Sequence, residues 1–445
     1  MENLEKLLKR IAGSVSFKLA VLAILTLLML IPAGMIQNLI REREQRRDET
    51  IMEVTSKWGN SQTVSGPVLT IPFKTHGMTK EGTVTSIHYM HFLPSDLDIS
   101  GSIIPEERYR GIYKVIAYKA RLSYKGTFEA ADMKTVAPEP ADVVWDDAYL
   151  EIGIPDMRGI NQPISVRWNE SDIPVLPGIP IKDIHASGVN AKVPVAENTT
   201  ASFSFELDLN GSHSLNFVPL GKETRVFLSS PWKDPSFMGS FLPDDHHITD
   251  TGFTAKWKIL QLNRNYPQLW EDDKVDTLDS DFGVSLIIPV DNYRKSMRSV
   301  KYAILFVALT FLLFFFAEYI HKTKIHPVHY LLVGIALTVF YTLLTALSEQ
   351  IPFSWAYLIA SAVIVVMIAL FTQSLYKNRR VSLTVALSLT ALYLFLFVIL
   401  QMTDYALLFG SIGLVLVLAI VMYFSRKIDW YENGKSRNTE SESIP

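Results

Sequence analysis

Long apolar runs at the two ends of the chain enclose a long polar segment. A helix needs about 20 apolar residues to cross the hydrocarbon core of a bilayer. Six runs meet this length, one near the amino terminus and five in close succession after the polar segment. They lie near residues 19–39, 302–320, 328–347, 353–376, 381–402 and 405–424. The pattern therefore predicts six transmembrane helices.

The polar segment itself changes pattern once. A charged stretch predicts a helix to about Trp58, and beyond it apolar residues recur at every second position, which is typical of half-buried strands. Such runs occur at 84–92, 111–124, 163–168 and 201–209. Asn210-Gly211-Ser212 predicts a hairpin turn into 214–218. We therefore expect a membrane α+β protein with a β-rich, sandwich-like domain inserted between helices one and two.

Charges in the short loops predict the orientation of the chain. Loops rich in lysine and arginine remain in the cytoplasm, and basic residues follow the second, fourth and sixth apolar runs, whereas Glu349 and Asp404 mark the loops after the third and fifth. We therefore expect an inner-membrane, multi-pass protein with both termini cytoplasmic and residues 41–300 periplasmic. An uncleaved signal anchor explains the first run better than a secretory signal.

These patterns divide the chain into five parts. Residues 1–18 form a cytoplasmic amphipathic segment, although an extension of the first span is an equally good interpretation. The predicted parts that follow are transmembrane helix 1 (19–40), the extracytoplasmic domain with its charged amino-terminal helix (41–300), a five-helix transmembrane bundle (301–424) and a partly disordered cytoplasmic tail (425–445).

Composition narrows the chemistry. The 445 residues are 49% hydrophobic, carry a net charge of -3 and include no cysteine. The absence of cysteine excludes disulfides, thiolate metal sites and cysteine nucleophiles, so the polar domain must be held by its core alone. Without a basic domain or stripe, nucleic acid is not an expected partner.

No catalytic constellation emerges from the motifs. Ser230-Pro231-Trp232-Lys233 matches Ser-x-x-Lys, but the partner motifs of penicillin-interacting enzymes are absent. His88 and His91 lie in a strand run, where positions three apart face opposite sides. We therefore predict no catalytic residue, no metal ligand and no cofactor.

The stretch E-Y-I-H-K-T-K-I-H-P-V-H-Y, residues 318–330, holds a carboxylate and three histidines. This spacing occurs in helical metal sites, but its position between two spans also fits a cytoplasmic helix turn, with Pro327 in the first turn of the following helix. A salt-bridged or pH-sensitive cluster is a third interpretation. Ionisable groups in or near membrane spans are often functional. The candidate functional polar residues are therefore Glu318, His326, Glu349 and Asp404.

Several long strings resemble the CreD family of bacterial inner-membrane proteins, over essentially the whole chain. In the polar segment they are S-G-P-V-L-T-I-P (65–72), D-M-R-G-I (156–160), P-S-F-M-G-S-F-L-P (235–243) and L-N-R-N-Y-P-Q-L-W (262–270). In the apolar part they are K-Y-A-I-L-F-V-A-L-T-F (301–311), I-H-P-V-H-Y-L-L-V-G-I-A-L-T-V-F-Y (325–341), D-Y-A-L-L-F-G-S-I (404–412) and R-K-I-D-W-Y (426–431). The family pattern keeps Glu318, His326, Pro327 and Tyr330, whereas members can lack a histidine at 321 and 329, which argues against a four-ligand site.

The resemblance implies a role in cell-envelope integrity, a link to a carbon-source-responsive two-component system, and effects on β-lactam response and colicin tolerance, with no established reaction. We expect a non-enzymatic protein whose periplasmic β-domain contacts periplasmic or cell-wall components while the bundle, in the lipid bilayer with membrane protein partners, anchors it or relays its state. The alternatives are a small-molecule or lipid permease built from the five carboxy-terminal spans, and an outer-domain hydrolase in which Ser or Asp meets a His.

Overall fold

The protein consists of two compact units, Met1–Arg46 with Val290–Pro445, and Arg47–Pro289. The computed structural model describes residues 15–79, 82–129, 143–196, 199–272, 275–286, 292–323, 325–402 and 405–426. Residues 1–14 of the predicted amphipathic segment (1–18) and most of the carboxy-terminal tail lie outside the described residues. We treat the two units separately as the helical unit and the β unit.

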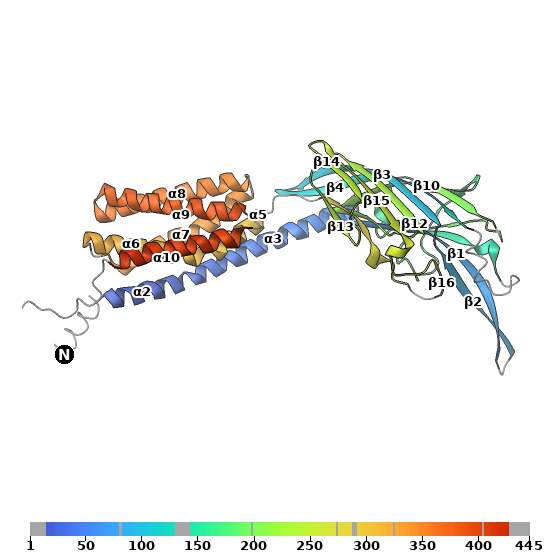
Figure 1. Cartoon of the computed structure of the whole chain (residues 1–445), viewed down its shortest axis with the longest axis horizontal. Helices are drawn as coiled ribbons and strands as arrows, with labels where there is room; N and C mark the ends of the chain where they lie inside the picture. The colour runs from blue at the N-terminus through green and yellow to red at the C-terminus, as the bar shows by residue number, and fades with distance from the viewer. Residues whose placement is uncertain are drawn as a thin grey trace, which may run out of the picture. The chain divides into compact units, whose positions relative to one another are not determined.

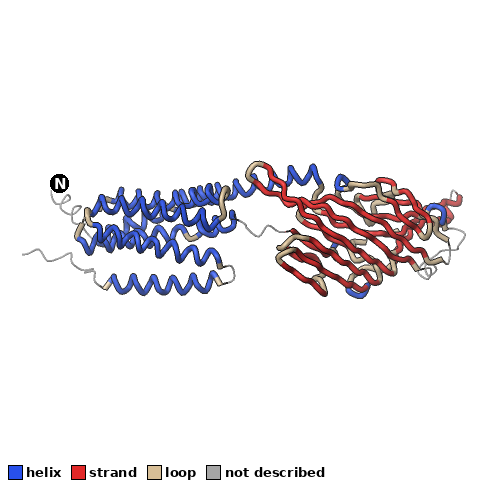
Figure 2. The backbone as a smooth tube through the Cα atoms, turned by 90° about the horizontal axis from the view of Figure 1, so that it is seen from above, coloured by secondary structure: helices blue, strands red, loops and turns tan. Residues whose placement is uncertain are grey.

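The helical unit contains long apolar helices that run side by side (Figures 1 and 2). They are α2 (Val15–Leu28), the first part of α3 (Leu30–Trp58), α6 (Ala303–His321), α7 (Pro327–Ser348), α8 (Phe353–Tyr376), α9 (Arg379–Gln401) and α10 (Ala406–Ser425). A short charged helix, α5 (Asn292–Lys301), precedes α6. Among the described residues, six segments are long and apolar enough to cross a membrane, with α2 and α3 forming the first. The predicted arrangement of one span before and five after the polar segment is confirmed.

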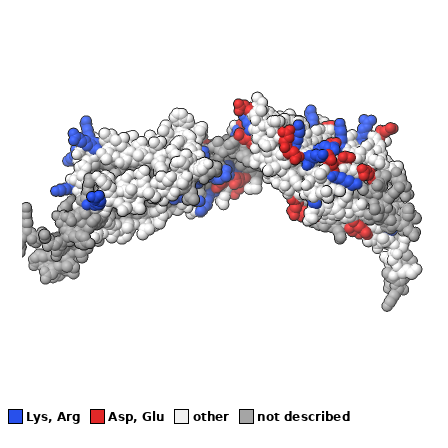
Figure 3. All heavy atoms as spheres, viewed as in Figure 1, with Lys and Arg blue, Asp and Glu red and all other residues white. Residues whose placement is uncertain are grey.

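Charge distribution fits this reading of the helices. In the helical unit, coloured charged side chains gather toward the ends and the middle is white (Figure 3). Inside, aromatic residues of α7, α8 and α9 pack together around Phe340, which is fully buried. The Tyr357 hydroxyl donates to the Tyr393 carbonyl at 2.7 Å, which satisfies a polar group that lipid would leave unpaired.

The β unit is built from two sheets. The nine-stranded sheet has the order β13-β17-β11-β1-β5-β9-β8, with β2 on β1 and β16 on β2. Its strands are β1 (Gln62–Thr79), β2 (Gly82–Phe92), β5 (Tyr149–Gly153), β8 (Leu176–Pro177), β9 (Gly188–Lys192), β11 (Ser214–Phe217), β13 (Pro235–Gly239), β16 (Leu269–Glu271) and β17 (Phe282–Leu286).

The eight-stranded sheet has the order β14-β15-β12-β3-β4-β10-β6-β7. Its strands are β3 (Asp96–Arg110), β4 (Tyr113–Phe128), β6 (Ser165–Trp168), β7 (Ser171–Pro174), β10 (Ala201–Ser212), β12 (Glu223–Ser230), β14 (Asp245–Thr249) and β15 (Gly252–Leu260).

One hydrophobic core joins the two sheets. Along β10, Phe203, Phe205 and Leu207 are buried whereas Ser202 and Glu206 are exposed, so one face of the strand turns inward. Residues of both sheets, including Leu69 and Phe217 of the nine-stranded sheet, belong to the same buried cluster. The predicted sandwich-like, β-rich insertion is confirmed.

The charged helix ends on the eight-stranded sheet. Helix α3 ends at Trp58, as its sequence predicts. The Arg108 guanidinium of β3 lies 3.6 Å from the centre of the Trp58 ring, and the Glu53 carboxylate lies 3.2 Å from Arg110. A cation held over an aromatic face is stabilising, and more so when it is shielded from water. Trp58 therefore anchors the carboxyl end of α3.

The hairpin predicted at residues 210–212 is wrong. Strand β10 continues through Ser212 in the eight-stranded sheet, and β11 starts at Ser214 in the nine-stranded sheet. The turn residue is His213, with φ of 61°. The chain crosses between sheets here because Leu215 and Phe217 must enter the core beside β1, which turn chemistry alone does not reveal.

Strands β1 and β2 extend away from the sandwich as a two-stranded arm (Figure 1). Residues 74 and 76–78 of β1 and 84–87 of β2 are exposed, and Met78 is 95% exposed. Exposed edges of a β-ribbon are templates for pairing with another strand. The arm is thus a projecting surface that offers both backbone hydrogen bonds and apolar side chains.

We predict that His213 makes the β unit less stable in mild acid. Burial lowers the pKa of His213 below its usual value, with partial opposition from the Asp48 carboxylate. The unfolded chain therefore binds a proton that the folded chain does not accept, so folding stability is lost as pH falls through about 6.5.

Thermal unfolding of the full-length protein in detergent, followed by tryptophan fluorescence at pH 7.5 and 5.5, measures this loss. His213→Asn keeps a residue that tolerates positive φ and should lose less stability over the same pH range. An equal loss in both proteins would contradict the prediction.

Candidate functional site

Glu318 is a buried carboxylate in the helical unit, where its exposed fraction is 6%. Lys18 Nζ of α2 lies 2.6 Å from Oε1, and the Ile325 backbone N–H donates to the same oxygen at 3.0 Å. The Tyr330 hydroxyl of α7 donates to Oε2 at 2.9 Å. Buried charges occur when they are paired and hydrogen bonded, and this carboxylate joins α2, α6, α7 and the turn between α6 and α7.

Local signals in the sequence build the turn that holds Glu318. Helix α6 closes with Lys322 in the left-handed conformation at φ of 51°. His326 is the N-cap of α7, and its Nδ1 accepts from the Val328 N–H at 3.3 Å, while Pro327 occupies the first turn. Proline there loses no intrahelical hydrogen bond. Residues 318–330 therefore form the turn that connects α6 to α7.

The histidines of this stretch do not join Glu318 in the part of the chain that the structure describes. His321 Nδ1 lies 3.0 Å from the Ala317 carbonyl, and His329 Nδ1 lies 3.2 Å from the His326 carbonyl. Each ring bonds to the backbone near its own position. Of the three interpretations offered by the sequence, the geometry favours the helix turn.

The other candidate polar residues lie elsewhere. Glu349 follows α7, and its Oε1 accepts from the Tyr293 hydroxyl of α5 at 3.0 Å. Asn292 beside it donates to the Ser348 carbonyl at 2.6 Å. His326 and Glu349 thus flank opposite ends of the 22-residue α7, about 33 Å apart at 1.5 Å per residue. Asp404 lies outside the described residues.

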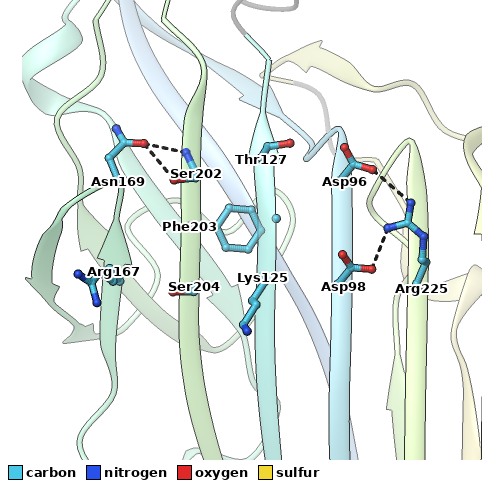
Figure 4. Close-up of a pocket in the computed structure, with 11 residues that line it drawn as sticks. Asp96, Asp98, Lys125, Thr127, Arg167, Asn169, Ser202, Phe203, Ser204 and Arg225 are labelled. Atoms are coloured by element: carbon cyan, nitrogen blue, oxygen red, sulfur yellow. Dashed lines mark hydrogen bonds and ion pairs between the residues drawn. The ribbon is translucent and has the colours of Figure 1, made fainter.

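The outer face of the eight-stranded sheet carries a polar groove of about 490 Å³ (Figure 4). Side chains from β3, β4, β6, β10 and β12, and from the turn after β6, line it. They are Asp96, Asp98, Lys125, Thr127, Arg167, Asn169, Ser202, Phe203, Ser204 and Arg225, with Gly126. Gly126 lacks a side chain above Phe203, whose Cζ would lie 2.5 Å from a Cβ there. The Phe203 ring is buried beneath the sheet, and the groove exposes hydroxyl, amide and charged groups.

The two ends of the groove differ in charge. Arg225 Nη1 bonds to Asp98 at 2.9 Å and Nη2 lies 3.7 Å from Asp96, and the hydrogen bond to Asp98 raises the pKa of Arg225. Lys125, which lies opposite Asp98 in the strand register, and Arg167 form no salt bridge with any described residue (Figure 4). The groove therefore offers two cations without an ion-pair contact beside hydrogen-bonding groups, which suits an anionic, hydroxyl-rich ligand.

A buried polar cluster in the β unit was not predicted from the sequence. Ser65 Oγ lies 2.9 Å from His185 Nε2, and His185 Nδ1 lies 3.7 Å from Glu151 Oε2. Thr70 Oγ1 lies 2.9 Å from His91 Nδ1, and His91 Nε2 lies 3.8 Å from Asp183 Oδ2. Residues up to about 120 positions apart meet here. One hint of this cluster was present in the sequence: His88 and His91 are three positions apart on a strand, so their side chains lie on opposite faces of the sheet.

Electrostatics in this cluster follow from burial. Desolvation lowers the pKa of His91 to about 4, which keeps its imidazole neutral at physiological pH, and desolvation raises the pKa of Glu151. Ser65, His185 and Glu151 have the order of a serine-hydrolase triad, but Ser65 is only 2% exposed. A nucleophile has to reach a substrate carbonyl, so this arrangement does not favour the hydrolase alternative.

Comparison with known proteins identifies relatives over almost the full length. A family model described as inner membrane protein CreD matches residues 14–431. The chain is also 31% identical over 433 residues to the inner membrane protein CreD of Escherichia coli strain K12, an alignment that covers 94% of each chain. Together with six apolar helices around a β-rich insertion, these matches show that the chain belongs to the CreD family of inner membrane proteins.

Proposed function

We propose that this chain is a non-enzymatic inner-membrane protein that supports cell-envelope integrity and the envelope stress response. In this proposal the β unit lies in the periplasm and contacts envelope components, and the helical unit anchors it or relays its state. Basic residues at the α6–α7 and α8–α9 turns, such as Lys322 and Lys377, support a cytoplasmic position for those turns. Glu349 follows α7 on the opposite side.

The polar groove on the eight-stranded sheet is the observation that carries this proposal. Wall glycans and their peptides offer hydroxyls, amides and carboxylates to such a surface. Lys125 and Arg167 bind the carboxylates, because hydrogen bonds to charged groups are about twice as strong as neutral ones. Asn169 and Ser204 bind hydroxyls or amides. The groove is open and shallow, which suits a polymer that runs across the sheet.

The geometry does not favour the permease alternative. Transport by proton relay relies on ionisable groups deep in a membrane bundle. Glu318 lies in the last turn of α6 with three donors on its carboxylate. Glu349 lies past the end of α7 with a partner in Tyr293. Both carboxylates link the ends of neighbouring helices, which is a structural role.

Photo-cross-linking tests the groove. A photoreactive residue in place of Ser202, within the groove, should capture a wall fragment or periplasmic protein in stressed cells. The same residue in place of Leu262, which is 87% exposed outside the groove, should not. Replacing Lys125 and Arg167 together by alanine should lower capture at position 202 at least about tenfold, because each lost charged hydrogen bond costs about 1.5–3 kcal/mol.

Lys233→Ala removes an exposed cation outside the groove and serves as the matched control, with capture at position 202 unchanged. Absence of any envelope product from position 202, or an identical product from position 262, would overturn the proposed role of the groove.

A further inference from the structure

Helix α5 has a buried face and a basic face. Its sequence, N-Y-R-K-S-M-R-S-V-K, contains no acidic residue. The buried face consists of Tyr293, Ser296, Ser299 and Val300. Residues three or four apart are neighbours on a helix surface, and by this spacing four cations share the opposite half: Arg294, Lys295, Arg298 and Lys301. The first and last of them are exposed, and the two between are partly exposed.

Helix α5 packs against the ends of α7 and α9. The Asn292 side-chain amide donates to the Ser348 carbonyl at the end of α7. Arg298 Nη2 donates to the Met402 carbonyl at 2.9 Å and to the Ile399 carbonyl at 3.4 Å. The last carbonyls of a helix have no intrahelical partner and carry partial negative charge. Arg298 therefore caps α9 and fixes α5 at this end of the bundle.

Lys295 contacts the same turn of α9. Its Nζ donates to Gln401 Oε1 at 3.2 Å, and Gln401 Nε2 donates to Ser354 Oγ, in the first turn of α8, also at 3.2 Å. The Lys295 ammonium also lies 5.6 Å from the centre of the Phe353 ring. Lys295 and Arg298 thus lie around one helix end, next to the start of α8.

Exposed aromatic residues mark the depth of this helix end in the membrane. Trp355, in the first turn of α8, is 61% exposed, and Tyr405, directly before α10, is 65% exposed. Tryptophan and tyrosine are enriched at the level of the lipid headgroups, where one part of the side chain is apolar and the other is wet. Because α8 and α10 begin where α9 ends, the cations of α5 lie at headgroup depth.

The cations of α5 keep unused binding capacity. Lys295, Arg298 and Lys301 form no ion pair with any carboxylate in the described part of the chain, and Arg298 Nε and Nη1 have no hydrogen-bond partner there. Glu349, at the same end of the bundle, accepts from the Tyr293 hydroxyl. At headgroup depth the anion at hand is the lipid phosphate. Arginine binds phosphate through several N–H groups and lysine binds it as a point charge.

We propose that Lys295, Arg298 and Lys301 of α5 bind the headgroup phosphate of an anionic phospholipid. A zwitterionic headgroup brings its own cation, which the basic face of α5 repels, so the site selects lipids with a net negative charge. The bound lipid supplies the charge that α5 lacks and bridges this helix to the end of α9.

The orientation proposed above gives this cluster added meaning. It places α5 on the periplasmic side, where short segments next to membrane spans carry few lysines and arginines. Four of them within one short helix run against that tendency, and a bound anion offsets their cost. Lipid binding by α5 itself depends neither on this orientation nor on the groove, so loss of groove capture in cells would leave it unaffected.

Native mass spectrometry of the full-length protein in a neutral detergent tests the site. The protein is titrated with phosphatidylglycerol or, separately, with phosphatidylcholine, and the bound lipids are counted. Each cation near an anionic headgroup contributes about fivefold in affinity. We therefore expect the first phosphatidylglycerol to bind at least about tenfold more tightly than phosphatidylcholine. Replacing Lys295 and Arg298 together by glutamine should weaken phosphatidylglycerol binding about 20-fold.

Two single variants keep the test decisive. Lys301→Gln changes an exposed side chain without a hydrogen bond or ion pair among the described residues, so it should fold even if the double variant does not, and it should weaken binding about fivefold. Lys377→Asn is the matched control, because it removes one exposed cation at the opposite end of α8, in a left-handed position that asparagine tolerates. It should bind phosphatidylglycerol like the wild type.

Inorganic phosphate separates a lipid from a free anion. Excess phosphate should leave the lipid bound, because acyl chains add apolar contact that a free ion lacks. Displacement by phosphate would show that the site takes the free anion. That result, equal binding of the two lipids by the wild type, wild-type binding by Lys301→Gln, or equal weakening in Lys377→Asn would each overturn the proposal.

Discussion

Glu318→Ala should lower the free energy of unfolding of the helical unit by about 3 kcal/mol, the lower end of the cost of breaking a buried ion pair. The lower end applies because the Lys18 side chain is 39% exposed and keeps access to water or lipid headgroups. Most of the loss comes from the Tyr330 hydroxyl and the Ile325 N–H, which lose their acceptor in a buried position.

A double-mutant cycle separates the contributions at Glu318. Glu318→Gln keeps an acceptor for Tyr330 or Ile325 and should cost about 1 kcal/mol, the value of one neutral hydrogen bond. Combining it with Lys18→Met removes both charges and should cost less than the sum of the single changes. Unfolding in detergent or retention of the folded fraction on heating provides the measurement. Wild-type stability in Glu318→Ala would show that the three contacts contribute nothing.

Arg264→Ala should destabilise the β unit by roughly 3 kcal/mol or more, since hydrogen bonds to a charged group are worth about 1.5–3 kcal/mol each. Arg264 is 9% exposed, and burial lowers the pKa of its guanidinium. Nη1 donates to the Tyr266 carbonyl at 2.6 Å, Nη2 donates to the Leu220 carbonyl at 3.3 Å, and Nη2 also bonds to Gln268 Oε1. The guanidinium stacks 4.3 Å from the Tyr266 ring.

Arg264→Lys is the matched comparison, because it retains the charge and loses the planar fork. It should recover less than half of the loss, since one ammonium cannot reach acceptors on both sides of the site. Chemical unfolding of the full-length protein, followed by the fluorescence of tryptophans in the β unit, reads out both variants. Equal stability of Arg264→Lys and the wild type would show that charge alone matters here.

Membrane spans could be predicted because length and hydropathy are properties of one continuous segment. The end of α3 at Trp58 was equally accessible, since the pattern changes period there. The turn from Glu318 to Tyr330 was readable in part: Pro327 indicated the start of α7, but nothing in the sequence paired Glu318 with Lys18, 300 positions away. Contacts of this kind depend on packing between helices.

In the β unit, too, local patterns could be predicted and contacts between distant segments could not. Alternation indicated strands such as β10, but not which sheet each strand joins, so Asn210-Gly211 suggested a hairpin where the chain changes sheets. The roles of the sequence strings that carry the family resemblance become visible only in the folded structure. Within residues 262–270, Arg264 bonds to both Tyr266 and Gln268. Ser65 and Thr70 of residues 65–72 orient two histidines that the sequence places far away.

Strand β1 also sets the order in which the β unit assembles. Its later part pairs with β2 across a local connection, from Leu69 with Phe92 to Thr79 with Gly82. Its first residues pair with β11, Gln62 with Leu215, and β3 likewise awaits β12. Pairing between distant segments is slow because loop closure precedes any gain in contacts. The arm is therefore expected to form early, while the start of β1 stays unpaired until residue 217 has arrived, an interval during which the nascent domain is open to proteases and to misassembly.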